Sequence, residues 1–320
     1  MPLTRLLAFA CVLLLQAVGA HAQSCVFTNT GINFGNVNLS SGGFQSASGT
    51  FSVSCTGTAG QAIRICANFN AGSGSANSSG DPRYLTQGAN TMSYNMFRSN
   101  GVGQVWGSYL WAAAPRPPSI SVNLNGSGAG SASQTIFGRL YNSQSGVTTG
   151  TFSSVFAGHQ TQIDYGYSSS FNCGTTLSPR VQSVPFTVRT TNNSSCIVAT
   201  TGLDFGTYTD LNSARTAVNS VSVTCTAGTI YSVGLGNGSS GGTGPTTRLM
   251  GNAATSEKIT YGIYRDSSYA LPWGNVAGTD TVSATGTGTA QNYSGYGRVP
   301  AQTTPPPLTY TDTVVVTVTY

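Results

Sequence analysis

The sequence has little charge and few of the side chains that carry catalytic chemistry. Only 7% of its 320 residues are charged, and the formal net charge is +5 at pH 7. The basic residues are scattered singly rather than gathered in a patch, so no nucleic-acid partner is expected. No C-x-x-C pair occurs, and the two histidines are His21 and His159. We therefore expect no metal site and no cofactor.

The sequence also lacks the motifs of common enzyme sites. No G-x-S-x-G elbow is present. The glycine-rich stretches at 72–80 and 238–244 are not followed by the lysine of a phosphate-binding loop. His159 has Asp164 nearby and Glu257 is the one glutamate, which is a weak basis for acid–base catalysis. We predict that the chain is not an enzyme.

Long hydrophobic runs are absent except at the start. Arg5 is followed by a mainly apolar run over residues 6–15 and then by Ala20-His21-Ala22. This pattern predicts a secretory signal peptide, residues 1–22, cleaved after Ala22. Cys25 lacks the preceding leucine of a lipoprotein site. No later run approaches the roughly 20 apolar residues of a membrane span, so we expect an exported chain without such a span.

What is abundant is glycine, with 41 residues, among strand-forming valine, threonine, tyrosine and phenylalanine. Many short strands separated by turns are typical of an all-β sandwich or barrel. The chain also repeats itself. Residues 25–35 (CVFTNTGINFG) match 196–206 (CIVATTGLDFG), and later landmarks recur in the same order. Residues 51–55, 94–98, 106–107 and 138–139 match 221–225, 261–265, 273–274 and 297–298. We predict two tandem domains of one fold.

Six cysteines lie beyond the signal, and an even number in an exported chain predicts disulfides. Two equivalent domains should close the same bridge, which pairs Cys25 with Cys55 and Cys196 with Cys225. Cys66 and Cys173 are then left for each other.

The stretch from 181 to 190 precedes the second repeat and has no equivalent before the first. Val184, Phe186 and Val188 alternate with polar residues, which predicts a strand with one buried face. Pro185 would remove a hydrogen bond from such a strand. An ordinary linker with a short last strand is the alternative interpretation.

The repeated C-x-x-x-x-T-G-[IL]-x-F-G, the later Y-x-[IM]-[FY]-R with W-G, and the closing YTDTVVVTVTY resemble the spore coat protein U family. That family includes subunits of archaic (Csu-type) chaperone–usher pili. The resemblance implies immunoglobulin-like β-sandwich, pilin-type domains, of which an incomplete one lacks its final strand. A periplasmic chaperone, and then the N-terminal segment of the adjacent pilin, would fill the gap by strand addition, with an outer-membrane usher as a further partner.

Within this family, the asymmetry between the two repeats of the chain predicts which kind of subunit it is. We expect an adhesin-like domain (23–180), a linker with a donor-type strand that completes it in cis (181–191), and a pilin domain (192–320). The edge of the open groove would carry Val314, Val316 and Val318. Only Gln23 and Ser24 would precede Cys25, too few to donate a strand. We predict a two-domain tip adhesin at the fimbrium tip; the alternative is a non-tip structural pilin or a coat or matrix protein.

The predicted contact with an abiotic or host surface is an apolar, proline-rich loop in the first domain. Its candidates are Tyr109, Leu110, Trp111, Pro115, Pro117 and Pro118. A second set is Tyr165 and Phe171, close to the Cys66–Cys173 bridge. The alternative is that residues 109–111 continue a strand into the core. Aromatic rings could also stack on sugars, so hydrophobic and sugar binding both stay open.

Overall fold

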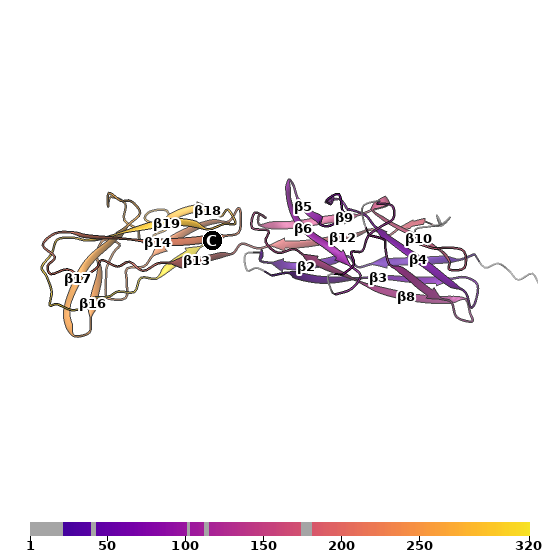
Figure 1. Cartoon of the computed structure of the whole chain (residues 1–320), viewed down its shortest axis with the longest axis horizontal. Coiled ribbons are helices and arrows are strands. Elements are labelled where there is room, and N and C mark those ends of the chain that lie inside the picture. The colour runs from indigo at the N-terminus through magenta and orange to yellow at the C-terminus, as the bar shows by residue number, and fades with distance from the viewer. Residues whose placement is uncertain (1–21, 40–42, 101–102, 112–114, 174–180) are drawn as a thin grey trace, which may run out of the picture.

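Two β-domains lie end to end in the chain (Figure 1). The computed structural model describes residues 22–39, 43–100, 103–111, 115–173 and 181–320. The strands of domain 1 run from Ser24 to Asn192 and those of domain 2 from Cys196 to Thr319. The predicted all-β fold with two tandem sandwich domains is confirmed. The predicted signal peptide lies, except for Ala22, outside the described residues. No described helix is long and apolar enough to cross a membrane.

Domain 1 has an eight-stranded sheet in the order β1-β3-β8-β6-β5-β9-β12-β2 and a four-stranded sheet in the order β11-β10-β4-β7. Its strands and the 3-10 helix η2 are β1 (Ser24–Asn29), β2 (Ile32–Val37), β3 (Gln45–Thr56), β4 (Ala62–Phe69), β5 (Arg83–Gln87), β6 (Asn90–Phe97), β7 (Ser119–Asn123), β8 (Ala129–Leu140), β9 (Gly150–Phe156), η2 (Gly158–Gln160), β10 (Thr161–Tyr167), β11 (Val181–Ser183) and β12 (Phe186–Asn192).

Domain 2 has a five-stranded sheet in the order β13-β14-β19-β17-β16 and a three-stranded sheet in the order β18-β15-β20. Its strands are β13 (Cys196–Thr200), β14 (Arg215–Cys225), β15 (Ile230–Leu235), β16 (Arg248–Asn252), β17 (Thr255–Tyr264), β18 (Val282–Thr285), β19 (Gln291–Val299) and β20 (Val316–Thr319). The long β14–β19 pair corresponds to the β3–β8 pair of domain 1.

Alternation of apolar and polar residues sets the strands that face the core. Phe51, Val53 and Cys55 of β3 are buried while the residues between them are not, because successive side chains of a strand point to opposite faces. Each repeated disulfide joins two cysteines that lie directly opposite in an antiparallel pair. The predicted bridges Cys25–Cys55, Cys66–Cys173 and Cys196–Cys225 are all present.

Strand β12 completes the core of domain 1. It pairs antiparallel with β9 and parallel with β2, so both of its edges are hydrogen-bonded. Phe186 stacks on Phe156, with 4.5 Å between ring centroids, and meets Phe69 edge-on at 4.8 Å. Pro185 lies just before the strand, so it removes no hydrogen bond from the ladder. The predicted linker thus belongs to domain 1, but as two strands: β11 pairs with β10 in the four-stranded sheet, and β12 lies in the eight-stranded sheet.

The two domains also contact each other directly beyond the connecting residues 193–195. The Thr149 amide donates to the Ala227 carbonyl over 3.2 Å. Thr226 Oγ1 also donates to the carbonyl of Asn193, one of the connecting residues, over 3.4 Å. These bonds join the residue before β9 and the residue after β12 to the turn that follows β14.

We predict that Phe186→Ala destabilises domain 1 by about 3–5 kcal/mol, because it empties the centre of an aromatic cluster. The measurement is urea unfolding followed by a probe of domain 1. Arg189→Ala is the matched control, since this residue lies on the same strand with an exposed side chain; its effect should stay within about 0.5 kcal/mol. Equal effects of the two substitutions would contradict a core role for β12.

Candidate functional site

The two segments that flank β12 in domain 1 have counterparts in domain 2 with no strand between them. By the sequence repeat, β2 corresponds to residues 203–208. Strand β9, which bridges β5 at Ser153, corresponds to the segment around Thr311, which bridges β16 at Gly251. Residues 203–208 and 309–315 are both described, and neither forms a strand.

The backbone of residues 309–315 is hydrogen-bonded on one side. The amide and carbonyl of Thr311 bond to Gly251, each over 2.9 Å, and the Thr313 and Val315 carbonyls accept from residues 239 and 236. In an extended chain the intervening residues, Asp312 and Val314, point their backbone groups the other way. Within residues 181–320 no backbone partner is found for those groups. The segment therefore presents a free edge.

The core of domain 2 is correspondingly open. Its core cluster has eleven buried hydrophobic residues, and another eleven that pack against the cluster are only partly buried, in a domain whose residues are all described. Val198 is 39% exposed, whereas Phe27, at the same place in domain 1, is 9% exposed and packs on Tyr165. The partly buried residues include the predicted groove-edge set Val314, Val316 and Val318.

Strand β20 continues this open side. It pairs only with β15 and forms the edge of its sheet, whereas β10, its counterpart, lies between β4 and β11. We call residues 203–208, residues 309–315 and β20 together the open edge. It combines unpaired backbone with apolar side chains, which is the arrangement that accepts an added strand.

A buried arginine repeats in both domains, and the sequence comparison missed it. Arg83 and Arg248 are each 0% exposed. Each Nη2 donates to the Trp carbonyl of the repeated W-G motif, at 2.8 Å from Trp106 and from Trp273, and to the last carbonyl of β4 or β15. Burial lowers the pKa of Arg83 to about 10. The sequence signal was R-Y-L at residues 83–85 against R-L-M at residues 248–250.

The predicted contact loop lies against the outer face of the four-stranded sheet of domain 1. Asn68 of β4 holds it, because its Oδ1 accepts from the Tyr109 amide over 3.2 Å and from Ser108 Oγ over 3.4 Å. The Nδ2 of Asn68 donates to Asp164 Oδ2 of β10 over 2.9 Å. Asn68 and Asp164 are both buried, and burial raises the pKa of Asp164.

Residues 109–111 do not continue a strand. Leu110 is 40% exposed. Tyr109 and Trp111 are half-buried, and Trp111 lies 5.4 Å from the Arg83 guanidinium carbon. Of the three prolines, Pro115 is exposed, Pro118 half-buried and Pro117 buried. Residues 112–114 lie outside the described part of the chain. The exposed apolar part of the loop is thus smaller than its sequence suggests.

Tyr165 and Phe171 are not surface groups, and the structure corrects that prediction. They are 3% and 5% exposed. Tyr165 packs edge-on against Phe27, with ring centroids 5.4 Å apart. Phe171 covers Gly166, where an added Cβ would lie 2.9 Å from the Phe171 Cβ. The Cys66–Cys173 bridge ties this segment down onto β4, which buries it.

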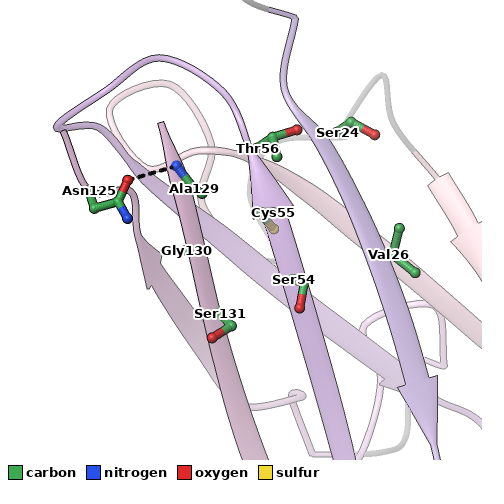
Figure 2. Close-up of a pocket in the computed structure, with 9 residues that line it drawn as sticks. All are labelled: Ser24, Val26, Ser54, Cys55, Thr56, Asn125, Ala129, Gly130 and Ser131. Atoms are coloured by element: carbon green, nitrogen blue, oxygen red, sulfur yellow. Dashed lines mark hydrogen bonds between the residues drawn. The ribbon is translucent and has the colours of Figure 1, made fainter. Parts of the chain in front are cut away.

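A shallow hollow of about 500 Å³ lies on the outer face of β1, β3 and β8 (Figure 2). Small side chains line it, and Asn125 Oδ1 accepts from the Ala129 amide at its rim, over 3.1 Å. Its lining residues are Ser24, Val26, Ser54, Cys55, Thr56, Asn125, Ala129, Gly130 and Ser131. None of them is charged, so the hollow offers no group for acid–base chemistry.

The histidine and the aspartate considered for catalysis have separate partners. His159 Nε2 lies 2.9 Å from Gln160 Nε2, while Asp164 accepts from Asn68 and Gln162. No hydrogen bond among the described residues joins them. Three or more His, Cys, Asp or Glu side chains do not gather into a metal-binding group anywhere in the described ranges.

The fold and the open edge define a pair of pilin-like β-sandwiches, one closed and one incomplete. The chain belongs to the Spore Coat Protein U domain family, whose profile matches residues 12–158 and 182–317. The predicted family is thereby confirmed. The second match begins within β11 and therefore also covers β12.

Protein U of Myxococcus xanthus is 36% identical over 128 residues, which are 37% of this chain and 71% of that protein. In structure, the chain is similar to one in the CsuC–CsuE chaperone–tip adhesion subunit pre-assembly complex of archaic chaperone–usher Csu pili of Acinetobacter baumannii. The TM-score is 0.51 at 14% identity, over 93% of this chain and 100% of that one. The CupB6 tip adhesin of Pseudomonas aeruginosa gives a TM-score of 0.36 at 12% identity, over 94% and 96%. These structural likenesses concern the fold.

We predict a pH signature for Asp164. Its raised pKa means that, above pH 3.8, the native protein at first holds a proton that the unfolded chain has released. The stability of domain 1 should therefore fall as pH rises through this window. Asp164→Asn removes this pH-dependent loss, so the stability of the variant relative to the wild type should increase as the pH rises from 3.8. The measurement is the free energy of unfolding in urea.

Asp204→Asn, an exposed change in domain 2, is the control and should leave the pH dependence of domain 1 unaltered. If the stability of the Asp164 variant and that of the wild type changed with pH in the same way, burial of this carboxylate would not destabilise domain 1.

Proposed function

We propose that the chain is the tip subunit of a pilus built by a chaperone–usher pathway. Domain 2 takes up a strand from the adjacent pilin subunit, and domain 1 attaches the fibre to a surface. One observation supports this most strongly: domain 1 carries its own closing strand β12, while the matching place in domain 2 has free walls and no strand. A subunit of this kind accepts one partner strand.

Domain 1 serves as the template for the missing contact. A strand placed like β12 would run antiparallel to residues 309–315 and parallel to residues 203–208. Every second side chain would enter the core, as Phe186, Val188 and Thr190 do. Main-chain bonds on both sides would supply affinity, and the inward side chains would supply specificity.

The open edge also accounts for the expected partners. Unpaired strand edges and half-exposed valines invite aggregation until they are covered. A periplasmic chaperone that lends a strand would protect domain 2 until the usher exchanges it for the adjacent pilin, and domain 1 would need no such help. The finished subunit would lie at the cell surface.

Attachment is assigned to the exposed part of the loop around Leu110. Removing apolar side chains from water on a hydrophobic surface releases roughly 25 cal/mol per Å². The anchoring of the loop through Asn68 reduces the ordering cost of contact. Sugar stacking on Tyr109 or Trp111 is the alternative mode.

A coat or matrix protein without a tip role is the second candidate, favoured by the description of the family as the Spore Coat Protein U domain. Antibody labelling separates the two. One label per fibre end supports the tip role, and labelling along the shaft or over the cell surface supports the alternative.

The strand-uptake prediction uses a synthetic peptide with residues 183–193 of this chain, the sequence that fills the equivalent place in domain 1. Added to the purified full chain, it should slow amide exchange in residues 203–208 and 309–315, because their free backbone groups gain partners. At 100 times its Kd it should also stabilise domain 2 by about 2.7 kcal/mol.

A peptide with aspartate in place of Phe186 and Val188 is the control and should do neither. Exchange that is already slow throughout the open edge, without any peptide, would contradict an acceptor site in domain 2.

The attachment prediction concerns Leu110→Ala combined with Trp111→Ala. In assembled fibres this double variant should bind hydrophobic plastic several-fold less, while fibre yield stays normal. Leu271→Ala, which removes a 52% exposed leucine from domain 2, is the control and should bind as the wild type does. Unchanged binding of the double variant would exclude this loop, and inhibition by free sugars would favour the lectin mode.

A further inference from the structure

Asp312 is the most highly connected side chain of the open edge. Its Oδ1 accepts from the amides of Ser239, Ser240 and Thr313 over 2.8, 3.0 and 2.9 Å. Its Oδ2 accepts from the Tyr261 hydroxyl over 2.7 Å. Hydrogen bonds to an ionised carboxylate are about twice as strong as neutral ones. One side chain thus fastens residues 309–315 to the 236–240 loop and to β17.

The corresponding residue in domain 1 is Ser154, which follows Ser153 as Asp312 follows Thr311. Ser154 Oγ accepts a hydrogen bond from the Gly74 amide over 3.1 Å. Strand β9, which contains it, is held on one side by β5 and paired along its whole length with β12 on the other. Domain 1 thus has a serine and a paired strand at the place where domain 2 has a carboxylate and no strand.

The groups around Asp312 favour its hydrogen bonds to the neighbouring elements. Burial and the bond to Asp312 raise the pKa of Tyr261, so its hydroxyl remains a donor at neutral pH. The buried Arg248 guanidinium is close enough to interact electrostatically with Asp312. The hydrogen bonds of Asp312 are made by its side chain, and none of them uses its backbone amide or carbonyl.

We propose that Asp312 is a positioning residue for strand uptake: it holds the wall of the open edge extended before the partner strand arrives. This rests on the proposed function. A wall that is already extended loses less conformational freedom when a strand pairs with it, which favours association. Once the strand is bound, the new backbone bonds hold the wall and the carboxylate is no longer needed for that purpose.

The test exchanges Asp312 for the residue that domain 1 uses, Asp312→Ser, in the full chain, with the peptide of residues 183–193 as the probe. Without peptide, exchange of the Thr311 amide should rise about tenfold or more, the loss expected for a set of charge-assisted bonds. The association rate of the peptide should fall by a similar factor. Its dissociation rate, and exchange of Thr311 in the bound state, should stay at wild-type values.

Asp312→Asn is the second variant, since one oxygen still accepts from the Ser239 and Ser240 amides. Its exchange rate at the Thr311 amide and its association rate with the peptide should both lie between those of the wild type and Asp312→Ser. If the Ser variant does not fold, the Asn variant alone must show slower association with unchanged dissociation. Equal association rates for wild type and variants, or a change confined to dissociation, would overturn the role of Asp312. Failure of the wild type itself to bind any strand peptide would instead overturn the proposed function.

Discussion

The structure depends on one constraint: the gap between two segments of each sandwich must be filled by a strand that pairs with both of them and also contributes side chains to the core. In domain 1, β12 does so, with β9 on one side, β2 on the other and Phe186 inside an aromatic cluster. The repeat shows how β12 affects the segment that pairs with it. The sequence I-x-F-G forms strand β2 at residues 32–35, whereas L-x-F-G at residues 203–206 forms none. The partner strand, not the local sequence, makes this segment a strand.

Domain 2 keeps its fold around the gap because its other connections point away from it. The Cys196–Cys225 bridge fixes β13 to β14. Arg248 gathers the carbonyls of Leu235 and Trp273 inside the domain, as Arg83 does for Phe69 and Trp106. Such a buried cation is tolerated because each of its three nitrogens donates to a carbonyl oxygen. The cost of incompleteness is therefore confined to the open edge.

The sequence predicted the parts of this arrangement that leave a periodic or repeated signal. Alternation identified Val184, Phe186 and Val188 as one face, and the repeat paired the cysteines. It missed Arg83 and Arg248 because a lone arginine in a strand reads as an exposed residue. It misplaced Tyr165, which faces the inner core and packs on Phe27. It misplaced Phe171 because the pattern does not show that the Cys66–Cys173 bridge folds this segment back onto β10.

The direction of the strands at the junction between the domains indicates which end of domain 1 lies far from domain 2. Strand β12 finishes at Asn192, next to domain 2, and β8 runs from Ala129 at the opposite end. That far end is formed by the turns at 57–61 and 124–128, which bond to each other. Asn68, the anchor of the contact loop, lies six residues along β4 from Ala62, about 20 Å back from that end. Attachment through the loop around Leu110 would therefore lay domain 1 along a surface, and the hollow in Figure 2, at the far end, would face outward.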